Sequence, residues 1–410
     1  MPTPKFLIVT TVPETLITIL KNQPKFLATA LAERVAVELV TSPGPECSAI
    51  EQIEGLPVHP VHMARGISPL KDLLSLLSMI RLLLRIKPGM VHSYTAKAGL
   101  ITMLAAWICR VPVRIHTFTG LVFPTQKGMK QIILIWTDRL TCACASTIIP
   151  EGQGVKDDLM RFSITRKPLN LIGHGNIAGV DTMHFHRPAE NVPEQSRDLA
   201  RKLGLSGQEF IFCFVGRLNR DKGIAELLEA FGTLPEYTRL ILIGALDLTA
   251  PICEQDQLII NQHKRIHALG FFTDIRPALH LANVLVLPSY REGFPNAVLQ
   301  AGAMELPVIA TDINGCNEVV KPSMNGWLVP PRSAAALHDA MRTALDTPPL
   351  MRRRMGVLAR QRIVQRFEQK QHWRNMANFY TERLSSLQEN TVQGGYSGRE
   401  QEQKKLLNRL

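Results

Sequence analysis

The chain has 410 residues, of which 45% are hydrophobic and 20% charged, so it can bury a large core and is predicted to form two domains. Its formal net charge of +12 and pI of about 9.5 favour anionic partners such as phosphorylated ligands, acidic lipid head groups or nucleic acid. The seven cysteines show no C-x-x-C spacing and are scattered through apolar stretches, which implies no disulfide framework and predicts reduced thiols. The opening MPTPKFLIVTT is unlike a signal peptide, and the longest clean apolar run, 98–109, is too short to cross a bilayer. We therefore expect a cytoplasmic protein without a transmembrane anchor.

Short runs rich in β-branched residues alternate with helical patterns along the chain, which is typical of parallel sheets with crossover helices. The first set of expected strands is 6–9, 36–41, 90–92, 113–116 and 146–150, with helices at 70–86 and 98–109. After a polar, proline-containing stretch, the second set is 210–215, 239–244, 284–287, 308–311 and 327–329. The predicted fold class is α/β, with two doubly wound domains whose ligands lie at the carboxyl ends of the strands.

A basic turn follows the first strand of the second set, in FVGRLNRDKGIAELLEAF. Gly216, Arg217 and Lys222 precede a helix with apolar residues at helical spacing. Two cations and free backbone amides at a helix N-terminus suit a phosphate or diphosphate. The segment alone is equally consistent with a basic surface turn, and it lacks the spacing of a P-loop.

A second loop, in REGFPNAVLQ, places Glu292, Gly293 and Phe294 between a strand and a helix that contains Gln300. A glycine permits close backbone approach to a ligand, and the carboxylate of Glu292 is an acceptor suited to sugar hydroxyls. The amide of Gln300 is suited to a ribose diol. In isolation, a solvated loop acid and a surface glutamine explain this segment at least as well.

The ordered motifs of the chain resemble those of one known family. In the second half they are GRLNRDKG, LILIGALD, LGFFTDIRPALHLANVLVLPS, YREGFPNAVLQAGAMELPVIATD and NGCNEVVKPSMNGWLVPP. They are similar to the donor-domain motifs of the family-4 retaining glycosyltransferases, which have the GT-B fold of two Rossmann-like domains facing a cleft. In the first half, TTVPETL, VHSYTAKAGLITMLAA, VPVRIHTFTGLVF and IGHGNIAGVD resemble a bacterial branch of that family that builds surface polysaccharides such as capsule, exopolysaccharide and O-antigen.

The resemblance implies a role for each matching residue. Arg217 and Lys222 would hold the donor diphosphate beside Gly216, and Glu292 would contact the donor sugar. Gly293 and Phe294 would shape the loop beside the phosphate. The segment from Gly270 to Phe272 would border the nucleotide base, and Gln300 would meet the ribose.

The chain departs from the family pattern at two positions. Gln300 stands where the family commonly has a second glutamate, so the ribose contact lacks a charge. Glu305 replaces a usual glycine before LPV, and a positive φ there would add strain on the order of 1 kcal/mol.

The first domain supplies candidates of its own. His116, in RIHTFTG, is predicted at the carboxyl end of a strand, facing the cleft, where the resemblance implies a sugar-facing histidine. A satisfied core or surface histidine is the alternative. Glu14, Lys97 and His92 follow other strands and are candidates for the acceptor side, with structural roles equally open. Two further residues, His174 and Asp181, are expected in the loop that approaches the second domain.

The resemblance implies transfer with retention, in which the leaving phosphate accepts the acceptor's proton and no protein nucleophile is needed. No D-x-D occurs, so the cationic pair is expected to replace a metal ion, and neither a metal nor another cofactor is predicted. The donor would be a nucleotide-sugar, most simply a UDP-sugar carrying a hexose or N-acetylhexosamine. The acceptor would be a glycan linked to polyprenyl diphosphate.

The expected domains are 1–185 on the acceptor side and 186–368 on the donor side, with a crossover helix at 369–388 and a flexible tail at 389–410. The leucine-rich helix 70–86 has basic residues in or beside it. It packs on the sheet in the simpler interpretation, or attaches the enzyme peripherally to the anionic inner face of the cytoplasmic membrane.

Three functions compete at this point. The first is a glycosyltransferase of surface polysaccharide synthesis, and the second is another GT-B enzyme such as a nucleotide-sugar epimerase. The third is a basic nucleic-acid-binding protein, which is disfavoured because only 6% of residues are aromatic and the basic residues are dispersed. We expect no nucleic-acid partner.

Overall fold

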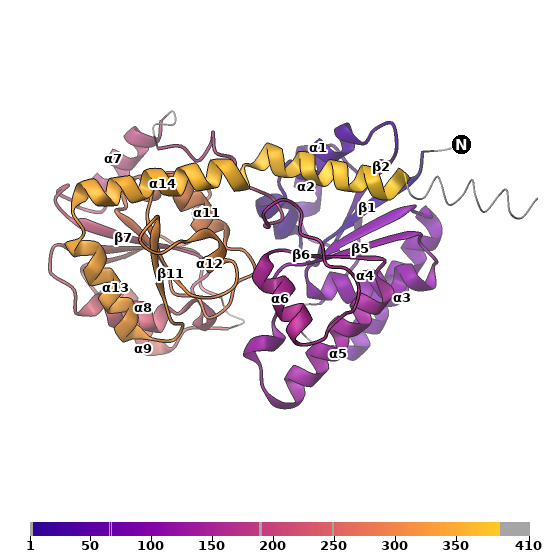
Figure 1. Ribbon diagram of the computed structural model, residues 1–410, viewed down its shortest axis with the longest axis horizontal. Coiled ribbons are helices and arrows are strands. Elements are labelled where there is room, and N and C mark those ends of the chain that lie inside the picture. Colours follow the sequence, from indigo (N-terminus) through magenta and orange to yellow (C-terminus); the bar gives the residue numbers. More distant parts are fainter. Residues whose placement is uncertain (1–2, 65, 67, 188–190, 248–249, 386–410) are drawn as a thin grey trace, which may run out of the picture.

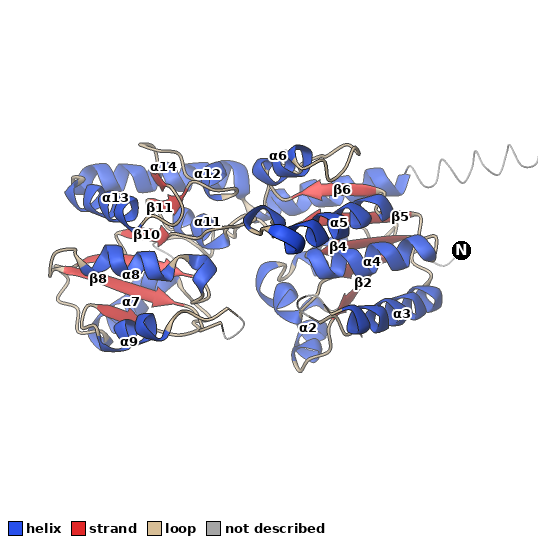
Figure 2. Ribbon diagram, turned by 90° about the horizontal axis from the view of Figure 1, so that it is seen from below, coloured by secondary structure: helices blue, strands red, loops and turns tan. Residues whose placement is uncertain are grey.

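The computed structural model describes residues 3–64, 66, 68–187, 191–247 and 250–385. Within them the chain forms two parallel sheets of six strands, and helices cover both faces of each sheet (Figure 1; Figure 2). The two domains lie side by side along the long axis of the molecule, and one helical stretch runs across both (Figure 1). The predicted pair of doubly wound α/β domains is confirmed.

The first sheet has the strand order β3-β2-β1-β4-β5-β6. Its strands are β1 Lys5–Val9, β2 Ala36–Thr41, β3 Val58–Pro60, β4 Met90–Tyr94, β5 Val113–Phe118 and β6 Thr147–Pro150. Its helices are α1 Gln23–Ala30, α2 Glu46–Glu54, α3 Pro69–Ile86, α4 Ala96–Ile108, α5 Gly128–Cys144 and α6 Gln153–Arg161, with short turns of helix at Thr15–Ile19 and Phe123–Thr125. In the register of the central strands, Ile8 lies opposite Leu39 on one side and His92 on the other.

The second sheet has the order β12-β11-β10-β7-β8-β9. Its strands are β7 Phe210–Val215, β8 Thr238–Ile243, β9 Ile266–Ala268, β10 Val284–Leu287, β11 Val308–Thr311 and β12 Gly326–Val329. Its helices are α7 Val192–Lys202, α8 Ile224–Gly232, α9 Glu254–Gln262, α10 Arg276–Leu281, α11 Asn296–Ala303, α12 Cys316–Val319, α13 Ala334–Asp346 and α14 Pro349–Phe367, with one 3-10 turn at Arg220–Lys222.

All ten strands expected from the sequence are present. The structure has two more, the edge strands β3 and β9, which the sequence did not predict. Each is only three residues long, and in each only the first residue is buried. Such short edge strands carry too few residues for an alternating or continuous apolar pattern to be recognised. A further difference is the length of β5, which continues two residues beyond His116 to Phe118.

Three apolar clusters form the core. One fills the second domain on both faces of its sheet, and the other two lie in the first domain, where adjacent residues of β1 alternate between them. One of the latter includes Met376, Ala377, Tyr380 and Leu384, which belong to a helix at 369–385. Because a parallel sheet must be covered on both faces, this C-terminal helix completes the core of the first domain.

The chain crosses between the domains twice, and the two crossings pair with each other. Val180, on the first crossing, accepts a hydrogen bond from the backbone N–H of Gln369 at 3.0 Å and donates one to the carbonyl of Phe367 at 2.8 Å. A Cβ on the neighbouring Gly179 would lie 2.6 Å from the Cα of Gln369, so only glycine permits this approach. The α14 helix ends here, and the 369–385 helix continues onto the first domain (Figure 1).

His92 connects that C-terminal helix to the first sheet. Its side chain is fully buried, with Nδ1 2.6 Å from the Tyr380 hydroxyl and Nε2 2.7 Å from Thr117 Oγ1. Burial holds the pKa of His92 well below its ordinary value, so the ring is neutral and uses one nitrogen as donor and one as acceptor. The placement of His92 on an acceptor surface is therefore wrong.

Replacing Tyr380 by phenylalanine is expected to destabilise the first domain by about 1–3 kcal/mol, because it leaves a buried nitrogen of His92 without its partner. Urea denaturation monitored by circular dichroism measures the effect. Glu382→Gln, at an exposed position of the same helix, serves as control. Equal midpoints for the two variants would contradict the assigned hydrogen bond.

Candidate active site

A glycine follows each of three neighbouring strands at its carboxyl end, on the side of the second sheet that faces the first domain. Gly216, Gly244 and Gly270 follow β7, β8 and β9. The Gly216 amide donates to Ile243 at 2.9 Å, and the Gly244 amide donates to Gly270 at 2.8 Å. This stretch carries no side chains at the three glycines, and Phe271 and Phe272, which follow Gly270, are exposed. Gly216 and Gly270 thus lie at the carboxyl ends of the same group of strands, and the contact of Gly270 and Phe272 with a nucleotide base stays a prediction.

Lys222 and Glu292 form an ion pair in the loops after β7 and β10. Both side chains are largely buried, with exposed fractions of 21% and 12%. Arg217, from the same basic turn, pairs with Asp247 but is 63% exposed. The structure therefore brings the predicted acid and the predicted lysine into direct contact, and it leaves the arginine accessible to a ligand.

The loop that carries these cations is held by side chains within it and next to it. Asn219 Oδ1 caps the short helical turn by accepting the N–H of Lys222 at 3.1 Å, and its amide donates to Asp247 at 3.1 Å. Asp221 accepts two bonds from Arg291, at 2.9 and 3.1 Å. Since Arg291 immediately precedes Glu292, these contacts fix the spacing between the two loops.

The two domains approach each other closely at Gly293. A Cβ at this position would lie 2.2 Å from Oε2 of Glu151 and 2.7 Å from the amide nitrogen of Gly120. Glu151 follows β6 and Gly120 follows β5, so the carboxyl ends of the two sheets face each other across this contact. Gly293 is therefore required for the approach of the domains, in addition to the phosphate contact that the sequence predicts for it.

Phe294 and Gln300 take different positions. Phe294 is 6% exposed and packs its ring 5.3 Å from that of Phe367, so its side chain supports the loop from below instead of facing a ligand. Gln300 is half-buried in α11, one turn past the start of that helix.

Glu318 joins the domains beside this contact. Its carboxylate accepts the backbone N–H groups of Gln153 at 2.7 Å and Gly154 at 3.0 Å, which open α6. An anionic side chain at a helix N-terminus is favourable because it meets unpaired amides and the positive end of the dipole. The neighbouring Asn314 donates to Asp158 at 2.7 Å. A cavity of about 800 Å³, lined by both domains, opens next to these bonds and includes His174.

Glu151 is a site residue that the sequence did not identify. It is 5% exposed, and burial together with the nearby carboxylates of Glu292 and Glu318 raises its pKa well above the ordinary value. In PEGQGVKDDL nothing distinguishes it from a solvated acid at the start of a helix. Its position after β6 is the one signal available, because residues that follow parallel strands face the cleft.

His116 does not face the cleft. It lies inside β5, is fully buried, and places Nδ1 2.9 Å from Ser93 Oγ and 3.1 Å from the Ser93 carbonyl. A Cβ on Gly99 would lie 2.3 Å from its ring, so the imidazole is packed under α4. Burial lowers its pKa to about 4. The predicted position is wrong because the strand continues to Phe118, and contact with a donor sugar is not supported.

The remaining candidates are dispersed. Lys97 pairs with Asp72 at 2.6 Å, and Glu14 precedes the Thr15–Ile19 turn. Asp181 accepts the backbone N–H groups of Met183 and His184, at 3.0 and 2.9 Å, and so shapes the first crossing. Across the described ranges, no three His, Cys, Asp or Glu side chains are grouped as a metal site.

Two family models match the chain, one in each domain. Residues 26–175 match the "Glycosyl transferase 4-like domain" and residues 209–347 match "Glycosyl transferases group 1". The "UDP-Gal:alpha-D-GlcNAc-diphosphoundecaprenol alpha-1,3-galactosyltransferase" of Escherichia coli is 31% identical over 274 residues, which are 65% of this chain and 69% of that protein. The chain belongs to the family-4 glycosyltransferases.

A second curated relative supports this family assignment, and two solved structures support the fold. The "Capsular polysaccharide biosynthesis glycosyltransferase CapM" of Staphylococcus aureus is 29% identical over 368 residues, covering 89% of this chain and 93% of that protein. Among solved structures, Anabaena HepE in complex with UDP superposes with a TM-score of 0.74 at 18% identity, over 92% of this chain and 100% of the other. WaaG, "a glycosyltransferase involved in lipopolysaccharide biosynthesis", gives 0.68 at 14% identity, over 91% and 99%. The GT-B fold is thereby confirmed.

Glu151→Gln is expected to stabilise the glycosyltransferase at neutral pH. Because the folded-state pKa of Glu151 is raised, the folded chain holds a proton that the unfolded chain releases above the ordinary pKa of 4.5. The unfolding free energy of the native protein therefore loses about 1.4 kcal/mol per pH unit from this group, until the pH passes its folded pKa. Glutamine carries no such proton.

Urea denaturation of both proteins between pH 4 and pH 8 measures the difference. It is expected to be near zero at pH 4 and to grow with pH, and Glu33→Gln, at an exposed position of the same domain, is the control for removing a surface carboxyl group. A Glu151→Gln difference that is constant across this range would show that the native carboxyl is not held protonated.

Proposed function

We propose that the protein is a retaining glycosyltransferase that moves a hexose or N-acetylhexosamine from a UDP-sugar to a glycan on polyprenyl diphosphate, in the synthesis of a surface polysaccharide. The observation that carries this proposal is the ion pair of Lys222 with Glu292, together with the exposed Arg217 of the same basic turn, at the carboxyl ends of the second sheet's strands. Two cations suit a diphosphate, and an acid beside them suits sugar hydroxyls.

The names of the relatives support the choice of donor and acceptor. The Escherichia coli relative is named for a UDP-Gal donor and an acceptor on diphosphoundecaprenol, and CapM is named for capsular polysaccharide. HepE has been solved with UDP and with UDP-glucose. A uridine nucleotide and a lipid-linked acceptor are therefore the simplest substrates for this chain.

The proposed mechanism assigns charge neutralisation to the basic turn. As the bond from sugar to phosphate breaks, negative charge grows on the diphosphate, and Arg217 and Lys222 stabilise it. The acceptor hydroxyl attacks from the same face, and the leaving phosphate takes its proton. The carboxylate of Glu292 accepts a hydrogen bond from a hydroxyl of the donor sugar. Donor binding therefore replaces part of the contact between Glu292 and Lys222. Because both cations would neutralise the diphosphate in this arrangement, we propose that no metal ion is required.

Calorimetric titration with UDP, GDP and their sugar conjugates in the presence of a chelator tests this mechanism. Arg217→Ala is expected to weaken UDP binding by about tenfold or more, since hydrogen bonds to charged groups contribute about 1.5–3 kcal/mol. Glu292→Ala removes the partner of Lys222, so UDP binding is kept or strengthened while the extra affinity of the sugar conjugate is lost.

Arg220→Ala is the matched control, because Arg220 is exposed in the same turn. If native protein binds no nucleotide, or binds it only when a divalent metal is added, the donor site or its metal independence is refuted.

We further propose that the first domain attaches peripherally to the anionic inner face of the cytoplasmic membrane. None of the described helices is long and apolar enough to span a bilayer. The α3, α4 and α5 helices lie side by side on one face of the first domain (Figure 2) and expose large apolar side chains. These are Leu70, Leu73, Leu74, Leu77, Leu84, Trp107, Ile108, Met129, Ile132, Ile133, Trp136 and Leu140, which we term the apolar face.

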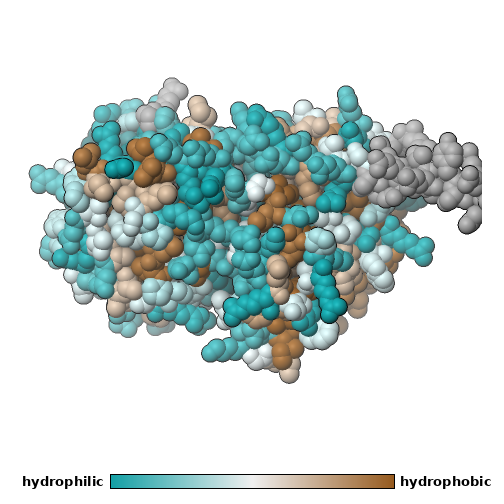
Figure 3. Space-filling view, in the orientation of Figure 1, coloured by the Kyte–Doolittle hydropathy of each residue, from teal (hydrophilic) through white to brown (hydrophobic). Residues whose placement is uncertain are grey.

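The apolar face is larger than the single leucine-rich helix that the sequence indicates. Figure 3 shows hydrophobic residues reaching the surface at the lower end of the first domain, where α5 lies. Exposed basic residues surround them: Lys71, Arg81, Arg85, Lys87, Lys127 and Lys130. Apolar side chains that enter the interface, together with cations that meet anionic head groups, are the two components of peripheral binding.

The double variant Ile132→Ser/Trp136→Ser is expected to bind vesicles of phosphatidylglycerol and phosphatidylethanolamine at least about tenfold more weakly than the native protein, because each buried side chain contributes about 1.5–3 kcal/mol. Vesicle cosedimentation measures it. Leu350→Ser, at an exposed leucine of the second domain, is the control. Binding should decrease in high salt; salt-insensitive binding, or binding by the double variant equal to that of the control, would contradict this surface.

A further inference from the structure

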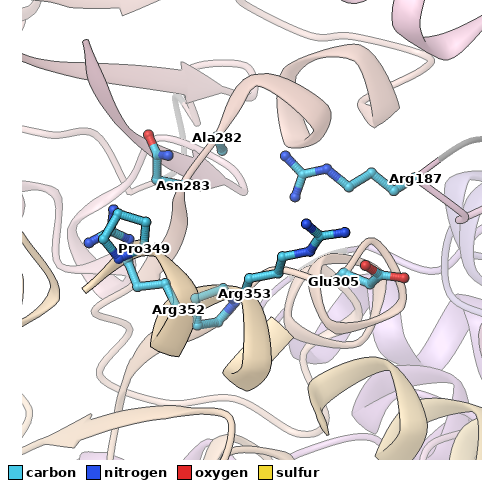
Figure 4. A pocket seen from close by; sticks show the side chains of 8 residues that line it. Arg187, Ala282, Asn283, Glu305, Pro349, Arg352 and Arg353 are labelled. Atoms are coloured by element: carbon cyan, nitrogen blue, oxygen red, sulfur yellow. The ribbon is translucent and has the colours of Figure 1, made fainter. Parts of the chain in front are cut away.

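A second cluster of cations lies at the opposite edge of the donor domain. It surrounds a cavity of about 380 Å³ near the amino ends of β10 and β11 (Figure 4). The lining residues are Arg187, Ala282, Asn283, Glu305, Pro307, Pro349, Arg352 and Arg353. Because nucleotide-sugars bind at the carboxyl ends of the strands, this cavity is separate from the proposed donor site.

Each of the three arginines has guanidinium N–H groups that make no hydrogen bond to a described residue and can donate to a ligand in the cavity. Arg187 donates one hydrogen bond to the His280 carbonyl at 3.1 Å. Arg352 uses one nitrogen on the last carbonyls of α13, and its guanidinium lies 4.8 Å from the centre of the Phe210 ring. Arg353 is exposed and has no hydrogen bond or ion pair to any described residue. Figure 4 shows the guanidinium groups of Arg187 and Arg353 converging on the cavity.

The charges around the cavity are not balanced. Three positive groups face one negative group, Glu305, and no ion pair within 4.0 Å joins Glu305 to an arginine of the described chain. Burial and the proximity of Arg353 lower the pKa of Arg187, whereas Glu305 opposes that change. Like charges held together in a partly buried site repel each other unless an anion lies between them.

Glu305 is held in an unfavourable backbone conformation. Its φ is +59°, a left-handed conformation that glycine adopts freely and that costs a non-glycine residue on the order of 1 kcal/mol. The carbonyl of Glu305 is packed against Gly356 of α14, where an added Cβ would lie 2.0 Å away. The acid therefore lines the cavity at an energetic cost that a glycine would not carry.

We propose that this cavity binds a small phosphate-bearing anion, with Arg187 and Arg353 as its principal ligands and Arg352 as a third cation. Arginine matches phosphate oxygens with paired donors, and a dianion balances three positive charges and one negative charge. The proposal does not depend on the donor or the acceptor of the glycosyltransferase.

Binding here also links the two segments that run to the first domain. Arg187 belongs to the first crossing and Arg353 to α14, which leads to the second. These segments already make contact, since Arg360 of α14 donates to the carbonyls of Thr182 and Phe185 at 2.9 Å. An anion between Arg187 and Arg353 adds a further bridge, so we expect it to raise the melting temperature.

Calorimetric titration of the full chain with inorganic phosphate at constant ionic strength tests the site. Saturating UDP is present so that phosphate does not occupy the donor cations. Arg353→Ala is expected to weaken phosphate binding about tenfold or more, and Arg354→Ala, at the adjacent exposed position outside the cavity, to leave it unchanged. Glu305→Gln is expected to strengthen it several-fold, because it removes the negative charge.

Opposite effects at Arg353 and Glu305 would not follow from a loss of folding. Arg187→Ala gives the same weakening as Arg353→Ala if it folds. The proposal is overturned if native protein binds no phosphate at millimolar concentration, if Arg353→Ala binds as tightly as Arg354→Ala, or if Glu305→Gln binds more weakly than the native chain. A parallel titration with a hexose phosphate identifies the source. Tighter binding than inorganic phosphate assigns the site to a phosphorylated metabolite, and equal binding assigns it to free phosphate.

UDP affinity is measured on the same variants, in separate titrations. It is expected to stay unchanged in all of them, because none of the substituted residues lies near Arg217 or Lys222. If native protein binds no UDP, the proposed donor site is refuted. The phosphate site is then tested on an Arg217→Ala/Lys222→Ala background, in which phosphate cannot bind to the donor-site cations.

Discussion

The arrangement of the active site depends on the backbone pairing between the two chain crossings. Val180 exchanges backbone hydrogen bonds with Phe367 and Gln369, and Gly179 allows the two crossing segments to approach each other. This pairing lies where α14 ends and the C-terminal helix begins, so it sets the direction in which that helix leaves the donor domain. The C-terminal helix then contributes Tyr380 to the core of the first domain. The carboxyl edges of both sheets face each other as a result, with Gly293 against Gly120 and Glu151.

The charges in this contact are arranged so that each domain supplies part of the other's electrostatic environment. Glu318 of the donor domain caps α6 of the first domain, and burial at the contact together with the carboxylates of Glu292 and Glu318 raises the pKa of Glu151. Three acids would repel each other if all were ionised and unpaired, but Lys222 and the amides of α6 balance two of them. The third, Glu151, is shifted toward its neutral form. Any change in the separation of the domains therefore changes the proton affinity of Glu151.

The two domains also present different outer surfaces. The first exposes leucines, isoleucines and tryptophans along α3–α5, beside basic side chains, whereas the second carries the arginine-lined cavity at the edge away from the cleft. An acceptor on a polyprenyl carrier would reach the cleft from the membrane side, and the nucleotide-sugar would reach it from water. The proposed phosphate site lies on neither route, which makes it suited to act on the crossings instead of on the substrates.

The sequence by itself determined the two parallel sheets and the donor-side motif, because strand patterns, the basic turn and the loop of Glu292 are local features. The resemblance to the family also marked Glu305 as a departure from its pattern, and the structure gives that residue a positive φ. Tertiary structure decided the rest. His116 is buried because β5 continues past it and packs against Gly99, and His92 is paired with Tyr380 from 288 residues away. Glu151 and the cavity around Arg187 and Arg353 depend on contacts between distant segments. A linear pattern reports which face of an element is apolar, but not which distant charge or ring will lie against it.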